Sequence, residues 1–119
     1  MTDLPKPVGP YSHARVFENL LYVSGQLPLD PATGEFNSQD PCEQMDQCLR
    51  NLAAVAKAFG TDITKTLKTT VLLTDLSRFG DINEVYGKHF TDPYPARACY
   101  QVAALPKGAQ VEIEAIIAI

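Results

Sequence analysis

The C-terminal nine residues constrain the fold most, because they place two carboxylates inside a stretch that is otherwise apolar. Residues 111–119 read Val-Glu-Ile-Glu-Ala-Ile-Ile-Ala-Ile. Side chains alternate between the two faces of a β-strand, so one face of this stretch is wholly apolar and the other carries Glu112 and Glu114. This pattern is typical of a central strand covered on both faces. Charges there are costly unless they are paired, and the nearest upstream cation in a strand-like segment is Arg97.

Helical and strand-like segments alternate along the rest of the chain. Asp40 can cap a helix that begins at Pro41, Glu43 completes a capping-box pattern, and Gly60 can end it. A second helix is expected over residues 77–90. The expected strands cover residues 12–17, 20–24, 67–74 and 96–103, with a turn at 30–34. This order predicts an α+β fold with one mixed sheet and both helices on one face.

The other face of the predicted sheet is left bare. In residues 96–103, alternation places Arg97 and Cys99 on the same side, and we expect them to share the bare face with Glu112 and Glu114. That face also carries apolar residues of the last strand. A bare and partly apolar sheet face on a small protein predicts a subunit interface.

The composition predicts an ordinary globular chain. Its 119 residues, 45% of them hydrophobic, predict one domain over residues 1–119. The net charge of −4 argues against a nucleic-acid surface. We expect neither a secretory signal nor a membrane helix. The three cysteines lack Cys-x-x-Cys spacing, which predicts reduced thiols in the cytoplasm, and with only two distant histidines no metal site is expected.

Arg97 and Glu112 are the first candidates for chemistry, and the residues alone leave two interpretations open. Arg97 could anchor an acidic substrate through its planar fork, or form a structural salt bridge with Glu112 or Glu114. Glu112 could act as a general base for water, or serve only as the ion-pair partner.

The other candidates are weaker when considered singly. Asn83 lies on the apolar stripe of the second helix and needs a hydrogen-bond partner, either to tie down a loop or to line a site. Cys99 is more typical of an inert thiol than of a nucleophile. The hydroxyl groups of Tyr11 and Ser24 indicate little alone.

Six short motifs together resemble the RidA/YjgF/UK114 family of reactive-intermediate deaminases, in order over nearly the whole chain. The motifs are Gly-Pro-Tyr-Ser (9–12), Val-Ser-Gly-Gln (23–26), Asp-Leu-Ser-Arg-Phe (75–79) with Asn83 and Tyr86, Pro-Ala-Arg (95–97), Leu-Pro-Lys (105–107) and Val-Glu-Ile-Glu-Ala-Ile (111–116). Two departures are that residues 90–95 form a short stretch and that His13 and Arg15 follow the tyrosine.

The resemblance implies a chorismate-mutase-like fold in which the last strand lies inside a mixed sheet backed by two helices. It also implies a homotrimer whose open sheet faces pack together, with three ligand clefts between subunits. The implied activity is hydrolysis of enamines or imines such as 2-aminoacrylate to a 2-oxo acid and ammonia, without a metal or organic cofactor.

By position, the resemblance implies that Arg97 grips the substrate carboxylate and Glu112 activates water. The backbone at Cys99 would contact the ligand or that water, and Tyr11, Ser24 and Asn83 would line the pocket. Alternatives within the family are a non-catalytic ligand-binding, regulatory or chaperone-like role, and a ribonuclease or translation inhibitor. The acidic balance of the chain counts against RNA cleavage.

Overall fold

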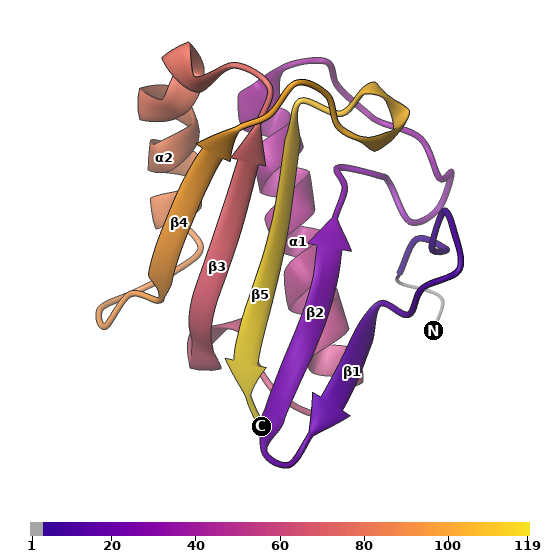
Figure 1. The fold of residues 1–119 in the computed structure, drawn as a ribbon, viewed down its shortest axis with the longest axis vertical. Coiled ribbons are helices and arrows are strands. Elements are labelled where there is room, and N and C mark those ends of the chain that lie inside the picture. The colour runs from indigo at the N-terminus through magenta and orange to yellow at the C-terminus, as the bar shows by residue number, and fades with distance from the viewer. Residues whose placement is uncertain (1–3) are drawn as a thin grey trace.

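The structure, a computed structural model that describes residues 4–119, contains a five-stranded sheet with both helices on the same face (Figure 1). The strand order is β1-β2-β5-β3-β4; β3 and β4 run parallel, and the other neighbours are antiparallel. The predicted mixed sheet, with its last strand inside, is therefore confirmed. The elements are β1 (Ala14–Phe17), β2 (Leu20–Gln26), α1 (Pro41–Ala58), β3 (Thr66–Leu73), α2 (Phe79–Gly87), β4 (Ala96–Gln101) and β5 (Val111–Ala118).

Helix α1 begins and ends close to where the sequence predicts. The Asp40 side chain accepts a hydrogen bond from the Cys42 backbone N–H at 3.3 Å, and Pro41 occupies the first turn. Phe59 is the C-cap, and Gly60 follows with φ of 81°, a conformation that glycine adopts without a steric penalty.

Helix α2 is shorter than the predicted span of residues 77–90. A 3-10 turn at Leu76–Arg78 precedes it, with the Asp75 side chain accepting a hydrogen bond from Ser77 N–H at 3.0 Å. The helix ends at Gly87, and Phe90 reaches the core from the segment beyond it.

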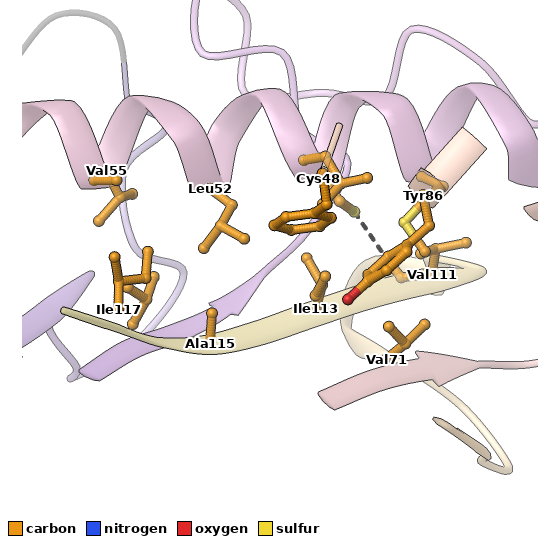
Figure 2. Packing of buried hydrophobic residues seen from close by; sticks show 14 of the residues in the cluster. Cys48, Leu52, Val55, Val71, Tyr86, Val111, Ile113, Ala115 and Ile117 are labelled. Atoms are coloured by element: carbon orange, nitrogen blue, oxygen red, sulfur yellow. Dashed lines mark hydrogen bonds between the residues drawn. The ribbon is translucent and has the colours of Figure 1, made fainter. Parts of the chain in front are cut away.

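The core lies between the helices and one face of the sheet (Figure 2). Alternate residues of β5 are buried beneath α1, which confirms the predicted apolar face. Cys48 of α1 donates a hydrogen bond through its thiol to the Val111 carbonyl at 3.6 Å. Because each large side chain in this layer contributes about 1.5–3 kcal/mol by burial, β5 is held firmly against α1.

The face assigned to Arg97 and Cys99 was predicted wrongly. In the parallel pair of β3 and β4, Thr69 is opposite Arg97 and Val71 is opposite Cys99. Thr69 and Val71 are buried beneath the helices. Paired residues share a face of the sheet, so Arg97 and Cys99 lie on the helix-covered face.

Glu112 and Glu114 lie on the opposite, open face. In the antiparallel pair of β3 and β5, Thr70 is opposite Glu114 and Leu72 is opposite Glu112. Thr70 and Leu72 alternate with the buried residues of β3, so both carboxylates point away from the helices. The predicted sharing of one face with Arg97 therefore does not occur within the chain.

Two register shifts interrupt the regular alternation. Ser24 and Gly25 of β2 together oppose the single residue Glu114, between the Val23–Ala115 and Gln26–Ile113 pairs, which makes a β-bulge. A second shift lies between Thr66 and Lys68 of β3. It leaves Leu67 51% exposed, whereas regular alternation would place Leu67 on the same face as the buried Thr69.

Within residues 4–119, no helix combines the length and apolar character needed to cross a bilayer. The expectation that the chain starts without a secretory signal depends in part on residues 1–3, which lie outside the described residues.

Candidate active site

Arg97 is held by one face of α2. Its Nη1 donates a hydrogen bond to Asn83 Oδ1 at 2.6 Å. The Cζ atom lies 4.7 Å from the centroid of the Tyr86 ring and 5.3 Å from that of Phe79. These three α2 residues are spaced four and three apart and so share one helix face. Cation–π contacts and the hydrogen bond together fix the guanidinium at the edge of the sheet.

The salt-bridge interpretation of Arg97 is wrong within this chain. Among residues 4–119, the ion pairs involve Arg50, Arg78 and His89, and none involves Arg97. A guanidinium carries five N–H donors in a planar fork. Asn83 takes one of them, which leaves the outer edge of the fork open to a carboxylate.

A hollow of about 410 Å³ opens beside the guanidinium. It is lined by Asn83, Tyr86, Gly87, Tyr94, Pro95 and Arg97. The Tyr86 hydroxyl shares a hydrogen bond of 2.8 Å with the Thr69 hydroxyl, which fixes the ring beneath Arg97. Burial raises the pKa of Tyr86 despite this bond and the nearby Arg97 charge, so its hydroxyl stays neutral.

Cys99 follows Arg97 on the same face of β4 and packs partly against the core. Burial raises the pKa of its thiol, while the Arg97 charge acts in the opposite direction. The thiol is therefore protonated near neutral pH, which agrees with the interpretation of an inert side chain. What Cys99 can offer a ligand in this position is its backbone.

Glu112 forms the other half of the candidate site. Its carboxylate lies directly against Gly25 of the bulge: a Cβ atom placed on Gly25 would be 2.4 Å from Glu112 Oε2. Burial raises the pKa of Glu112, and the charge of Glu114 raises it further. No ion pair to Glu112 occurs among residues 4–119, so the predicted pairing with Arg97 is again absent. A partly desolvated, unpaired carboxylate is a better proton acceptor than an exposed one.

Hydrogen bonds from Ser24 connect this bulge to the N-terminal segment that contains Tyr11. Its hydroxyl donates to the Ser12 carbonyl at 2.6 Å, and its N–H donates to the His13 carbonyl at 2.8 Å. The Tyr11 hydroxyl accepts a long hydrogen bond from Val8 N–H at 3.3 Å, and the ring is exposed. Tyr11 and Ser24 thus belong to the Glu112 half of the site.

The two halves cannot serve one small ligand within a single chain. Strand β3 lies between β4 and β5, so Arg97 and Glu112 are separated by two strand spacings across the sheet, roughly 10 Å, and by a further three residues along the strands. Their side chains also point to opposite faces. A site that uses both groups requires one half from each of two copies of the chain.

Sequence reasoning missed two residues that shape the halves. Gly25 appears in the Val-Ser-Gly-Gln motif, but only the bulge shows that its missing side chain makes room for Glu112. Helical spacing places Tyr86 on the apolar stripe of α2, and its position three residues after Asn83 is the available signal for a contact with the same partner. Across residues 4–119, no group of three His, Cys, Asp or Glu side chains could hold a metal ion.

Comparisons of the sequence with known proteins all indicate the same family. The model of the family described as "Endoribonuclease L-PSP" matches residues 1–119. The RutC family protein y4sK of Sinorhizobium fredii is 66% identical over 117 residues, covering 98% of this chain and 93% of the relative. The human protein named 2-iminobutanoate/2-iminopropanoate deaminase is 46% identical over 112 residues, covering 94% of this chain and 82% of the relative.

Solved structures of related proteins share this fold over the full length of the chain. RidA from the Antarctic bacterium Psychrobacter sp. PAMC 21119 superposes with a TM-score of 0.96 at 44% identity, covering 100% of this chain and 96% of that one. TdcF of E. coli, solved with bound serine, has a TM-score of 0.92 at 38% identity, covering 100% of this chain and 95% of that one. The chain therefore belongs to the RidA/YjgF family.

Proposed function

We propose that this protein hydrolyses short 2-imino acids and their enamine tautomers to 2-oxo acids and ammonia, in clefts formed between the copies of a homotrimer. The observation that carries the proposal is the Arg97 guanidinium, which is fixed by Asn83 and two aromatic rings but has no acidic partner among residues 4–119. Relatives named as 2-iminobutanoate/2-iminopropanoate deaminases support it.

Arg97 would bind the substrate carboxylate through the open edge of its fork. Two parallel N–H···O bonds fix the plane of the carboxylate and therefore the direction of the adjacent C=N carbon. The hollow beside Tyr86 and Tyr94 would receive the substrate side chain. Holding the carbon in one orientation supplies much of the acceleration, because the protonated imine is already electrophilic.

Glu112 from a neighbouring copy would then act on water. As the water oxygen bonds to the imine carbon, Glu112 accepts a proton from it, giving a carbinolamine. The proton passes to the amine nitrogen, the C–N bond breaks with its electron pair leaving on ammonia, and the hydroxyl oxygen becomes the keto oxygen after losing its proton. The reaction consumes one water and needs no oxidant or reductant. The raised pKa of Glu112 suits a group that both takes and returns a proton.

The open face of the sheet supports assembly. Phe17, Tyr22 and Tyr100 are exposed large hydrophobic residues. By register, Tyr22 is opposite Ile116 and Tyr100 is opposite Leu72, so both lie on the open face with Glu112. Apolar rings gathered on a bare face favour association between copies. The proposal requires that association through this face bring the Glu112 carboxylate of one copy near the β4 edge of another.

The activity is tested by generating the imine in situ from an amino acid with an oxidase or a dehydratase, then following release of the 2-oxo acid. We expect the protein to accelerate release over buffer, and Arg97→Ala to abolish the acceleration while the assembly stays intact by size-exclusion chromatography. Arg50→Ala, which removes a surface arginine paired with Asp46, is the matched control. Release at the buffer rate with wild-type protein contradicts the proposal.

The shared cleft has its own test. Arg97→Ala and Glu112→Gln copies, each with little turnover alone, are co-expressed with different tags and purified as mixed assemblies. Each mixed trimer, with two copies of one variant and one of the other, has one intact cleft out of three, so about a third of wild-type turnover should return. No recovery in verified mixed assemblies excludes a cleft built from two copies.

A further inference from the structure

His13 connects two segments that shape the Glu112 half of the site. Its Nε2 is hydrogen-bonded to the Pro5 carbonyl, and its Nδ1 lies 3.4 Å from Gln26 Nε2. Gln26 is only 2% exposed, and its Nε2 also donates to the Ser24 carbonyl at 3.1 Å. The imidazole therefore lies between the N-terminal segment and the bulge of β2.

The partners define which nitrogen of His13 carries the proton. The Pro5 carbonyl can only accept, so Nε2 is the donor. The Gln26 amide group that faces the ring is the NH₂, because the same group donates to the Ser24 carbonyl, so Nδ1 must accept. Both bonds exist together only in the neutral ring protonated at Nε2.

These bonds support two residues in this half of the site, Tyr11 and Glu112. The bond to Pro5 closes the loop of residues 5–13, which carries Tyr11. The bond to Gln26 supports the bulge at Ser24 and Gly25, against which the Glu112 carboxylate lies. A displacement of the imidazole would reach Tyr11 through the loop and Glu112 through the bulge.

We infer that neutral His13 is a positioning residue for the candidate site, and that its protonation breaks the hydrogen bond with Gln26 that supports the Ser24–Gly25 bulge. A proton on Nδ1 would face the Gln26 NH₂, donor against donor. Turning the Gln26 amide would place its oxygen against the Ser24 carbonyl instead. Either arrangement leaves a buried polar group without its partner, which is costly. The catalytic consequence rests on the proposed deaminase function.

Charged residues occur on three segments that adjoin either the imidazole's partners or the bulge. Lys6 follows Pro5 in the N-terminal segment, Arg15 is two residues along β1, and Glu112 approaches the bulge from β5. The raised pKa of Glu112 gives activity an acid-side dependence of its own. A test of His13 must therefore separate the two titrations.

The kinetic test compares the pH dependence of wild type with that of His13→Gln between about pH 5 and 8. Glutamine can still donate to Pro5 and accept from Gln26, but it cannot be protonated. We expect the ratio of wild-type to His13→Gln kcat/KM to fall about tenfold as the pH decreases from about 8 to about 5, because the Glu112 titration is common to both proteins and cancels. His13→Phe should be slower at every pH, with glutamine restoring the rate at neutral pH. A ratio that is constant with pH overturns the inference.

A spectroscopic test does not depend on turnover. Long-range ¹H–¹⁵N spectra distinguish the histidine tautomers, and His13→Gln assigns the signal against the other histidine, His89. We expect the Nε2–H form at high pH, and the backbone amides of Tyr11 and Gly25 to shift with the same midpoint as the ring. If these amides do not follow the ring, or if Nδ1 carries the proton, the inference is overturned. Absence of turnover in the wild type would instead count against the proposed function alone.

Discussion

Replacing Gly25 with alanine tests whether the carboxylate of Glu112 must sit where the bulge places it. A Cβ atom at this position would lie 2.4 Å from Oε2, 2.7 Å from Cδ and 3.1 Å from Cγ of Glu112. Favourable contacts between heavy atoms need about 3.5 Å. The carboxylate must therefore move by about 1 Å, because the backbone on both sides is held by strand pairing.

The expected loss falls on activity rather than on stability. Glu112 has no ion-pair partner among residues 4–119, so its side chain can rotate away at a cost of about 0.5–1.5 kcal/mol. Gly25 lacks a positive φ, so alanine adds no backbone strain there, and restricting the unfolded chain returns about 0.4–1 kcal/mol. A displacement of about 1 Å in a catalytic group costs about 100-fold in rate. We expect near-wild-type melting and a kcat/KM lower by about two orders of magnitude.

The assay is the imine hydrolysis measurement with melting followed in parallel, and Gly80→Ala is the control. Gly80 also lacks a positive φ, and a Cβ there would have open space around it. The specific cause is isolated by repeating Gly25→Ala in a Glu112→Gln background, where it should cost little more. If Gly25→Ala keeps more than half of the wild-type rate, or costs the same factor in both backgrounds, the reasoning about the bulge is refuted.

Four further substitutions and one control address the remaining contacts. Arg97→Lys removes the bidentate fork but keeps the charge, so we expect KM to rise at least about tenfold, whereas Arg78→Lys on the outer surface should leave KM unchanged. Asn83→Leu leaves the guanidinium without its 2.6 Å bond and should lower kcat/KM about tenfold, with weaker binding of a 2-oxo acid by calorimetry. Burial favours the protonated form of Glu112 in the folded state, which raises its pKa. This side chain therefore contributes stability at low pH, and that contribution is lost as the pH rises through the raised pKa. Glu112→Gln should therefore raise the melting temperature at about pH 7 but not at about pH 4, and Glu114→Gln should move the acid limb of the activity profile to lower pH.

The helices and the central position of β5 could be predicted because their signals are local. The cap at Asp40 and the glycine after α1 are read within one turn of helix, and the alternation from Val111 onward is read within one strand. Both depend on residues that are neighbours in the chain. Local signals of this kind survive folding unless tertiary packing overrides them.

The relative orientation of separate strands could not be read in the same way. Alternation shows that Arg97 and Cys99 share a side of β4, but it does not say which side faces the helices. Strand β4 lies at the edge of the sheet and has no fully buried residue, so neither of its sides carries the apolar signal that fixes β5. The side is decided by its parallel pairing with β3. The bulge at Gly25 could not be predicted for a related reason, because one extra residue in a strand gives no local sequence signal beyond the glycine itself.

The placement of Arg97 and Glu112 on opposite faces of the sheet has a chemical consequence. Had Arg97 and Glu112 met within one chain, they would have formed an ion pair that lowers the pKa of the carboxylate and occupies the fork of the guanidinium. On opposite faces, neither has an ion pair among residues 4–119: the guanidinium lies against the rings of α2, and the carboxylate lies against Gly25 with a raised pKa. In the proposed cleft, the substrate carboxylate would then lie on the guanidinium and the carbon under attack would lie between the two groups. Turnover should accordingly depend on assembly of the copies as well as on folding of each chain.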